Sequence, residues 1–288
     1  MDDDQVVLYS TRGHVATIMM NRPGMANAQD TALIDGIDHA LDLADADDEV
    51  RVVILAGKGK HFSSGHDLKE LVGDTEAGEW RKMRETPEGK LRHEQVMYVD
   101  KCRRLYAFRK PTIAAVQGAC VAAGMMLACM CDLIVAADDA TFQNPVLRMT
   151  GAGVELLVEP WELGVRKAKE FLFTGEKLDA QEAWRLGLVN RVVPLAELTE
   201  RVEELADRVR WCPRPPPRWS RTPSTRRRPS WARTPRGSTT SWPTTGCTTP
   251  RRHCRPSRPA GRSSRCPTSS PSTATDPLAP PRVRRTTA

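Results

Sequence analysis

The composition of this 288-residue chain changes abruptly near residue 211, and this break limits how much of the chain can fold. From Trp211 onward, the sequence contains sixteen of the 22 Pro, seventeen Arg, no Lys and a single acidic residue, Asp276. The whole chain has 43 basic and 36 acidic residues, so subtracting the seventeen Arg and the one Asp of the tail leaves 26 basic and 35 acidic residues. Residues 1–210 therefore carry a net charge of −9, and the basic character of the chain belongs to its tail, which carries +16.

The tail, residues 211–288, is rich in Pro, Arg, Ser and Thr and holds almost no Val, Ile or Leu. Such a segment cannot bury enough apolar surface to offset its chain entropy, so we expect it to be disordered. Pro-rich linkers and basic nucleic-acid-binding arms share this composition, but basic arms usually include Lys. Our hypothesis is a frame-shifted reading of a GC-rich gene, which resequencing would test.

The rest of the composition is that of an ordinary soluble protein in a reducing compartment. The eight Cys lack zinc-ligand spacing, and the acidic start resembles neither a secretory nor a mitochondrial signal. No apolar run approaches the ~18 residues that a membrane span requires. The sequence therefore predicts a cytoplasmic protein without a membrane anchor or a metal site.

Residues 1–210 show the pattern of repeated βα units, which is typical of an α/β fold. The first unit combines a hairpin over 6–20, a helix with Asp30 as its N-cap, and a buried strand over 52–56. A second strand over 112–116 begins the same pattern again. The remaining expected helices cover 91–109, 125–131, 156–163, 165–173, 180–186 and 195–210, and further strands cover 132–136 and 189–193.

Two short segments follow the buried strands and lead directly into helices. The first, Ser63–Leu68, reads SSGHDL, and the second, Gln117–Gly124, reads QGACVAAG. Each is also ordinary structure on its own, because Asp67 suits an N-cap and small residues let a helix pack closely on a strand. Backbone N–H groups at helix starts lack intrahelical acceptors. Two such groups aimed into a common pocket are what stabilising a thioester enolate or a tetrahedral oxyanion requires.

Four ordered segments resemble the enoyl-CoA hydratase/isomerase (crotonase) superfamily, from Val6 to about Arg210. They are NRPGMANA (21–28), VRVVILAGKGKHFSSGHDLKEL (50–71), KPTIAAVQGACVAAGMMLACMCDLIVAADDATFQNP (110–145) and WELGVRKAKEFLFTGEKLDAQEAWRLGLVNRVVP (161–194). The resemblance implies a crotonase fold, in which repeated ββα units form a spiral of two sheets flanked by helices. It also implies a hydro-lyase-type enzyme of fatty-acid or related acyl-CoA metabolism. Coenzyme A would enter as part of the substrate, with no permanently bound cofactor.

By the same resemblance, the oxyanion-binding N–H groups belong to His66 and Ala123. The segment Ser64–Lys69 would line the pantetheine and adenine path, and Arg22 would lie near the CoA phosphates. Met126 would line the acyl pocket, since Met fills irregular apolar space. The full set of expected substrate-binding residues is Arg22, Ser64, Gly65, Asp67, Leu68, Lys69, Gly124, Met126 and Val146.

The sequence departs from the family pattern at the positions that carry acid–base chemistry. Hydratases of this family use two glutamates to position a water and shuttle its proton, and the aligned residues here are Met126 and Val146. Neither side chain can transfer a proton. Glu155 and Glu159 lie in the segment that replaces a glycine-rich stretch of the family, and Glu155 is the preferred candidate for a catalytic role.

Alternative functions remain open at this stage. His66 carries an imidazole that could act near neutral pH, so decarboxylation or thioester hydrolysis could use this residue and the oxyanion site alone. The chain could also be an acyl-CoA-binding pseudoenzyme, or associate non-specifically with nucleic acid through its basic tail. Family members assemble as homotrimers or dimers of trimers through C-terminal helices, so the altered C-terminus predicts weakened assembly.

Overall fold

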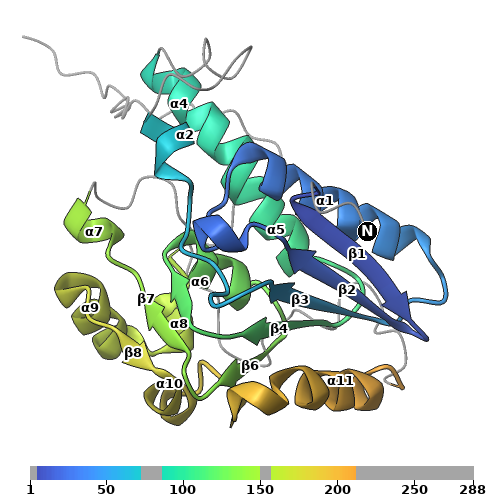
Figure 1. The fold of residues 1–288 in the computed structure, drawn as a ribbon. Coiled ribbons are helices and arrows are strands. Elements are labelled where there is room, and N and C mark those ends of the chain that lie inside the picture. Colours follow the sequence, from blue (N-terminus) through green and yellow to red (C-terminus); the bar gives the residue numbers. More distant parts are fainter. Residues whose placement is uncertain (1–4, 73–85, 150–156, 212–288) are drawn as a thin grey trace, which may run out of the picture. The chain divides into compact units, whose positions relative to one another are not determined.

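The structure of the protein is a computed structural model that describes residues 5–72, 86–149 and 157–211 (Figure 1). The predicted disorder of residues 212–288 therefore lies outside the described residues. Glu155, the preferred catalytic candidate, and most of the polar loop before residue 91 lie outside them as well. These predictions stay predictions.

A six-stranded sheet in the order β1-β2-β3-β4-β6-β9 forms the centre of the described chain. The antiparallel pair of β1 and β2 is the hairpin that the sequence predicts, and every other neighbouring pair is parallel. Parallel pairing requires crossover connections between successive strands, which the intervening helices provide. The strands are β1 (Val7–Arg12), β2 (Val15–Met20), β3 (Val52–Gly57), β4 (Thr112–Val116), β6 (Leu133–Ala137) and β9 (Arg191–Val193).

The sheet is buried on both faces because the side chains of its central strands alternate between two apolar clusters. In β3, Val53 and Leu55 join the larger cluster, whereas Val52 and Ile54 join the smaller one. Helix α1 (Thr31–Ala46) packs on the first face, and α11 (Leu198–Val209) lies along the second (Figure 1). Apolar residues on one stripe of α11 close the second cluster: Leu198, Val202, Leu205 and Ala206.

The predicted N-cap of α1 is confirmed, because Asp30 Oδ1 accepts a hydrogen bond from Leu33 N at 2.8 Å. The helix predicted over 91–109 begins earlier, at Pro87, and contains a π-helical turn. It runs as α4 (Pro87–Glu94), the π-helix η2 (Gln95–Asp100) and α5 (Lys101–Tyr106). Pro87 occupies the first turn, where its missing N–H is not needed.

A second, three-stranded sheet, in the order β5-β7-β8, provides the second sheet that the resemblance implies, although its strands were not located in the sequence. It contains β5 (Ala119–Val121), β7 (Thr141–Gln143) and β8 (Leu178–Asp179), each too short to show an alternating pattern. Strand β5 lies inside the expected turn over 118–124. As a result, α6 (Ala123–Cys129) begins two residues earlier than expected, directly after Ala122, whose φ is +48°.

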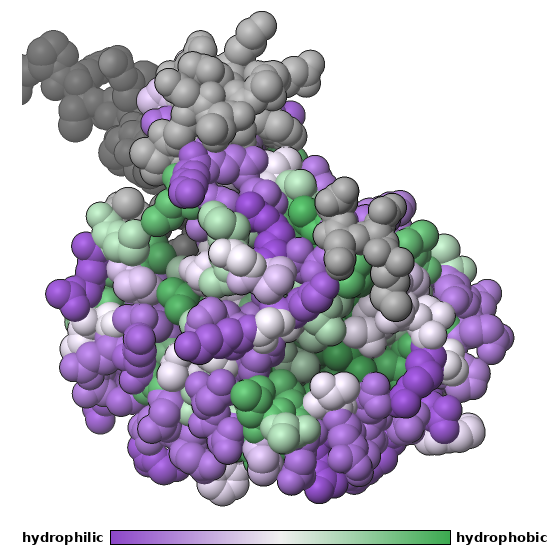
Figure 2. Space-filling model, viewed as in Figure 1, coloured by the Kyte–Doolittle hydropathy of each residue, from purple (hydrophilic) through white to green (hydrophobic). Residues whose placement is uncertain are grey.

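The remaining elements are short connections and the C-terminal helices. They are η1 (Pro23–Met25), α2 (Leu68–Val72), α7 (Val146–Met149), α8 (Glu159–Glu162), α9 (Val165–Thr174), α10 (Ala180–Leu186) and η3 (Leu195–Glu197). Hydrophilic residues dominate the face in Figure 2, with apolar residues in smaller patches. Phe173, Val165 and Trp184 on α9 and α10 are exposed. None of the helices in the described ranges is long and apolar enough to cross a membrane.

Candidate active site

The two strand–turn–helix segments meet and are joined by backbone hydrogen bonds. Ser63 N donates to Ala119 O at 3.1 Å, and Val121 N donates to Ser63 O at 3.0 Å. These bonds attach the turn after β3 to strand β5, which leads into α6. The prediction that the two turns share one site is therefore consistent with the geometry of the chain.

Two glycines allow the turns to approach this closely. A Cβ atom on Gly124 would lie 2.6 Å from Ser63 O, and a Cβ on Gly65 would lie 3.0 Å from Val121 O. Gly65 also has a φ of +95°, which L side chains rarely adopt. A Cβ atom on Gly65 would also lie 3.5 Å from Ala123 N. The two helix starts are therefore direct neighbours.

Several backbone N–H groups around this contact have acceptors. Asp67 N donates to Gln29 O at 2.9 Å, and Ala122 N donates to Gln143 O at 2.8 Å. The N–H groups of His66 and Ala123 donate no hydrogen bond to any described residue. They are the two groups that the sequence predicts for oxyanion binding.

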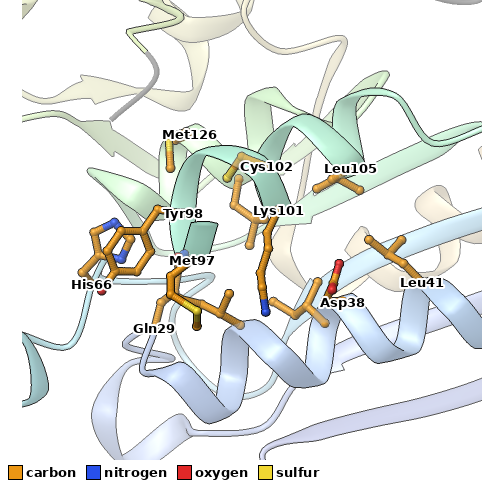
Figure 3. Close-up of a pocket in the computed structure, with 13 residues that line it drawn as sticks. Gln29, Asp38, Leu41, His66, Met97, Tyr98, Lys101, Cys102, Leu105 and Met126 are labelled. Atoms are coloured by element: carbon orange, nitrogen blue, oxygen red, sulfur yellow. The ribbon is translucent and has the colours of Figure 1, made fainter. Parts of the chain in front are cut away.

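The His66 side chain lies at one end of a pocket, against the ring of Tyr98 (Figure 3). The ring centroids are 3.9 Å apart with an interplanar angle of 42°, and His93 packs edge-on against the same Tyr98 ring at 5.7 Å. Both ring nitrogens of His66 are buried and have no hydrogen-bond partner among the described residues. The imidazole is therefore held by packing alone.

The pocket is narrow and mainly apolar, with a cavity volume of about 30 Å³. Leu41 and Leu105 lie at the end opposite His66, and Met126 and Leu127 reach it from α6 (Figure 3). Met126 thus lines the pocket, as the sequence predicts. The full lining is Gln29, Ile34, Ile37, Asp38, Leu41, His66, Met97, Tyr98, Lys101, Cys102, Leu105, Met126 and Leu127.

The expectation that His66 titrates near neutral pH needs correction. Burial and, to a smaller extent, the nearby His93 lower the pKa of its imidazole to about 4. The ring is therefore neutral at physiological pH, which makes it a weak base. Its packing against Tyr98 and its place in the pocket favour a role in shaping the acyl site.

Replacing His66 with Phe is expected to reduce the loss of stability in acid. In the wild type, the folded-state pKa of about 4 lies below the ordinary value of 6.5, so protons bind the unfolded chain first. Stability is then complete above about pH 6.5 and falls by about 3 kcal/mol as the pH drops through the folded pKa. Urea denaturation at a series of pH values measures this slope. An unchanged slope in His66→Phe would contradict the burial of a neutral imidazole.

The loop beside the first turn is organised by Arg22. Its guanidinium pairs with the carboxylates of Asp30 and Asp67, each at 3.1 Å. Asp67 Oδ1 in turn accepts from Lys69 N at 3.0 Å, as the N-cap of α2. Arg22 therefore holds two carboxylates of the site, and its predicted contact with the CoA phosphates stays a prediction.

Three of the six residues expected to line the CoA path are exposed. Ser64, Leu68 and Lys69 are exposed next to the joined turns. A flexible chain such as pantetheine could reach their backbone without rearrangement of the core. The contacts themselves stay predictions.

Sequence reasoning missed Asn27, which is fully buried in the loop after β2 and has a φ of +50°. Its Nδ2 donates to Lys58 O at 3.1 Å and to His61 O at 2.8 Å, and its Oδ1 accepts from Arg22 N at 2.9 Å. The ring Nδ1 of His61 then accepts from Ala119 N at 3.0 Å. Asn27 thus holds the loop before the first turn directly, and it is linked to the second turn through the His61 ring.

A second polar contact was also missed. Asn144 Nδ2 donates to Glu159 Oε1 at 2.7 Å, and Asn144 Oδ1 accepts from Val146 N at 3.2 Å. All three residues are buried. The pair joins residues on either side of a segment that lies outside the described residues, so no local pattern in the sequence could reveal it.

Asp132 joins the start of β6 to the start of β4. Its Oδ2 accepts from Thr112 N at 2.9 Å and from Thr112 Oγ1 at 3.0 Å. In the part of the chain that the structure describes, no group of three or more His, Cys, Asp or Glu residues could hold a metal ion.

A spiral α/β core with two joined turns over an apolar pocket defines the crotonase-fold class of proteins, and solved structures agree. An enoyl-CoA hydratase structure from Mycobacterium smegmatis is 45% identical, with a TM-score of 0.64, over 72% of this chain and 79% of its own. One from Mycobacterium thermoresistibile is 41% identical, with a TM-score of 0.66, over 73% and 81%. The predicted crotonase fold is confirmed.

A family model for enoyl-CoA hydratase/isomerase matches residues 10–215, and the chain belongs to this family. A Mycobacterium tuberculosis protein named as an enoyl-CoA hydratase, EchA13, is 41% identical over 208 residues. These residues are 68% of this chain but only 65% of that relative, so the chain spans slightly less than two thirds of its length. A short-chain enoyl-CoA hydratase from Clostridium acetobutylicum is 32% identical over 70% of this chain and 74% of its own.

Proposed function

We propose that this chain is an acyl-CoA thioester enzyme that adds water to an enoyl-CoA. The observation that carries the proposal is the pair of neighbouring backbone N–H groups, His66 and Ala123, that donate to no other described residue. Family membership supports an acyl-CoA substrate. Coenzyme A would be bound only as part of that substrate.

The two N–H groups would act on the thioester carbonyl oxygen. Negative charge develops on this oxygen when a nucleophile attacks C3 of an enoyl thioester or when a proton leaves C2. Fixed donors that point at the oxygen stabilise this charge without reorganising during the reaction. The donors are backbone groups held by the joined turns, so the arrangement does not depend on the identity of the side chains at these positions.

The acyl group would enter the pocket between α1, η2, α5 and α6. Its apolar lining suits a hydrocarbon chain. Tyr98 and His66 together form the end of the pocket nearest the joined turns (Figure 3).

Decarboxylation or thioester hydrolysis is the second candidate, and one observation favours it. His66 lines the pocket with two ring nitrogens that have no partner among the described residues, so its imidazole could donate to a polar acyl substituent. A carboxylated acyl group, such as malonyl, would offer an acceptor there.

The test is incubation of the purified chain with enoyl-, malonyl- and hydroxyacyl-CoA thioesters, followed by mass spectrometry of the products. A water adduct of an enoyl-CoA is the expected result. Loss of carbon dioxide or release of free CoA would instead favour the second candidate. Binding of thioesters without any product would contradict both and indicate a pseudoenzyme.

A further inference from the structure

Glu159 is the most deeply buried carboxyl group among the described residues, and the proposed oxyanion site makes no use of it. Its side chain is 1% exposed. One oxygen, Oε1, accepts the hydrogen bond from Asn144, whereas Oε2 has no partner in the described part of the chain. A buried carboxyl oxygen without a partner is costly, so its presence points to a partner that arrives with the substrate.

Asn144 places this carboxyl group next to one of the two positions where family hydratases carry a glutamate. Asn144 follows β7 directly, and its Oδ1 accepts from the backbone N of Val146. The last residue of β7, Gln143, accepts from Ala122 N, which precedes the proposed oxyanion donor Ala123. A single short strand therefore connects Asn144, and with it Glu159, to the oxyanion site.

The other glutamate position lies on α6, and Glu159 is close to that helix as well. Burial is the main cause of the raised pKa of the Cys129 thiol, and the charges of Glu162 and, less strongly, Glu159 add to it. Cys129 is three residues after Met126, so the two side chains lie on the same face of α6. The Glu159 carboxyl group is therefore bonded to Asn144 beside Val146, and it lies near enough to α6 to act on Cys129.

We propose that Glu159 is the acid–base residue of this chain and replaces both glutamates of the family hydratases; this inference rests on the proposed function. The ionised carboxylate takes a proton from water while the water oxygen bonds to C3 of the enoyl thioester. The π electrons of the C2–C3 bond move toward the thioester oxygen. The resulting enolate then takes the proton from Glu159 at C2, which restores the thioester carbonyl and the carboxylate.

The environment of Glu159 suits this role. Burial raises the pKa of its carboxyl group, and hydrogen bonds from Asn144 and from the backbone N–H groups of Glu159 and Val158 oppose part of the shift. Burial also raises the pKa of Glu162 on the same helix, and Glu159 adds to that shift, so the two carboxyl groups disfavour each other's ionisation. A carboxyl group with a raised pKa exchanges its proton closer to neutral pH, which improves acid–base catalysis.

The experiment compares Glu159→Gln with Glu162→Gln, its matched control on the same helix. Crotonyl-CoA is the kinetic probe, and calorimetric binding of butyryl-CoA reports whether the site is intact. We expect Glu159→Gln to lower kcat at least about 100-fold, the usual scale of lost acid–base catalysis, while butyryl-CoA binding changes less than about threefold. Glu162→Gln should keep kcat within about fivefold, because Glu162 makes no contact with Asn144.

The pH dependence separates a catalytic role from a structural one. Since the reaction needs the ionised carboxylate, kcat/KM of the wild type should fall as the pH drops through the pKa of Glu159, and Glu159→Asp should move this limb. A Glu159→Gln variant with more than about a tenth of the wild-type kcat would overturn the inference while leaving the proposed function standing. Equal losses in both variants, together with lost binding, would show a structural role. A wild type that turns over no enoyl-CoA would overturn both.

Discussion

Replacing Gly124 with Ala should abolish most of the thioester turnover and weaken the fold. The added Cβ would lie 2.6 Å from Ser63 O and 2.9 Å from Ser63 Cβ, and neither atom can swing away as the end of a flexible side chain could. The two turns must therefore separate, which moves the N–H of Ala123 away from that of His66. Loss of one oxyanion donor typically lowers kcat by about 100- to 1,000-fold, and overpacking costs about 1–3 kcal/mol.

Gly24→Ala is the matched control for this prediction. A Cβ at Gly24 would meet nothing within 4 Å, so this variant should keep both the activity and the stability of the wild type. Turnover of crotonyl-CoA and urea denaturation of the two variants give the comparison. Near-normal turnover in Gly124→Ala would mean that the joined turns do not form the oxyanion site.

Replacing Asn27 with Ala should cause the largest loss of stability among single polar substitutions at the site. The change removes three partly buried hydrogen bonds and leaves two carbonyl groups and one N–H group without these partners. Each such group costs about 1–3 kcal/mol, so we expect a total of about 3 kcal/mol or more. For a folded region of this size, that loss corresponds to a fall in Tm of about 6–12 °C.

Asn27→Gly distinguishes lost hydrogen bonds from backbone strain. Glycine accepts the φ of +50° freely but has no amide group, so this variant should also be strongly destabilised. Thermal unfolding followed by circular dichroism measures both variants. A wild-type Tm in Asn27→Gly would show that the amide contributes little and that conformational strain dominates in Asn27→Ala.

The parts of the fold with strong local patterns could be predicted from the sequence. Asp30 was recognised as a helix cap from its residue type and the apolar spacing that follows it, and β3 from its continuous apolar run. The two turns were found because the same pattern, a strand followed by small residues and a helix, occurs twice. Their contact through Ser63 and Ala119 followed from the repeated pattern, since successive βα units place their turns at the same sheet edge.

The parts that depend on distant contacts could not be predicted. Strand β5 has three residues, too few for a periodic signal, and it exists because β7 pairs with it. The partners of Arg22 were missed because its charge alone suited a phosphate as well as Asp30 and Asp67. Glu159 was ranked below Glu155 because only the folded chain shows which carboxyl group meets Asn144.

The joined turns have a consequence for how such a protein can diverge. In the proposed function, carbonyl polarisation comes from main-chain groups held by Ser63, Gly65 and Gly124, so ordinary side-chain substitutions at neighbouring positions would leave it intact. Proton transfer comes from side chains and is free to relocate from one helix to another. A lineage can therefore exchange its proton-transfer group, or lose it, while keeping thioester activation, and new reactions can arise without rebuilding the scaffold.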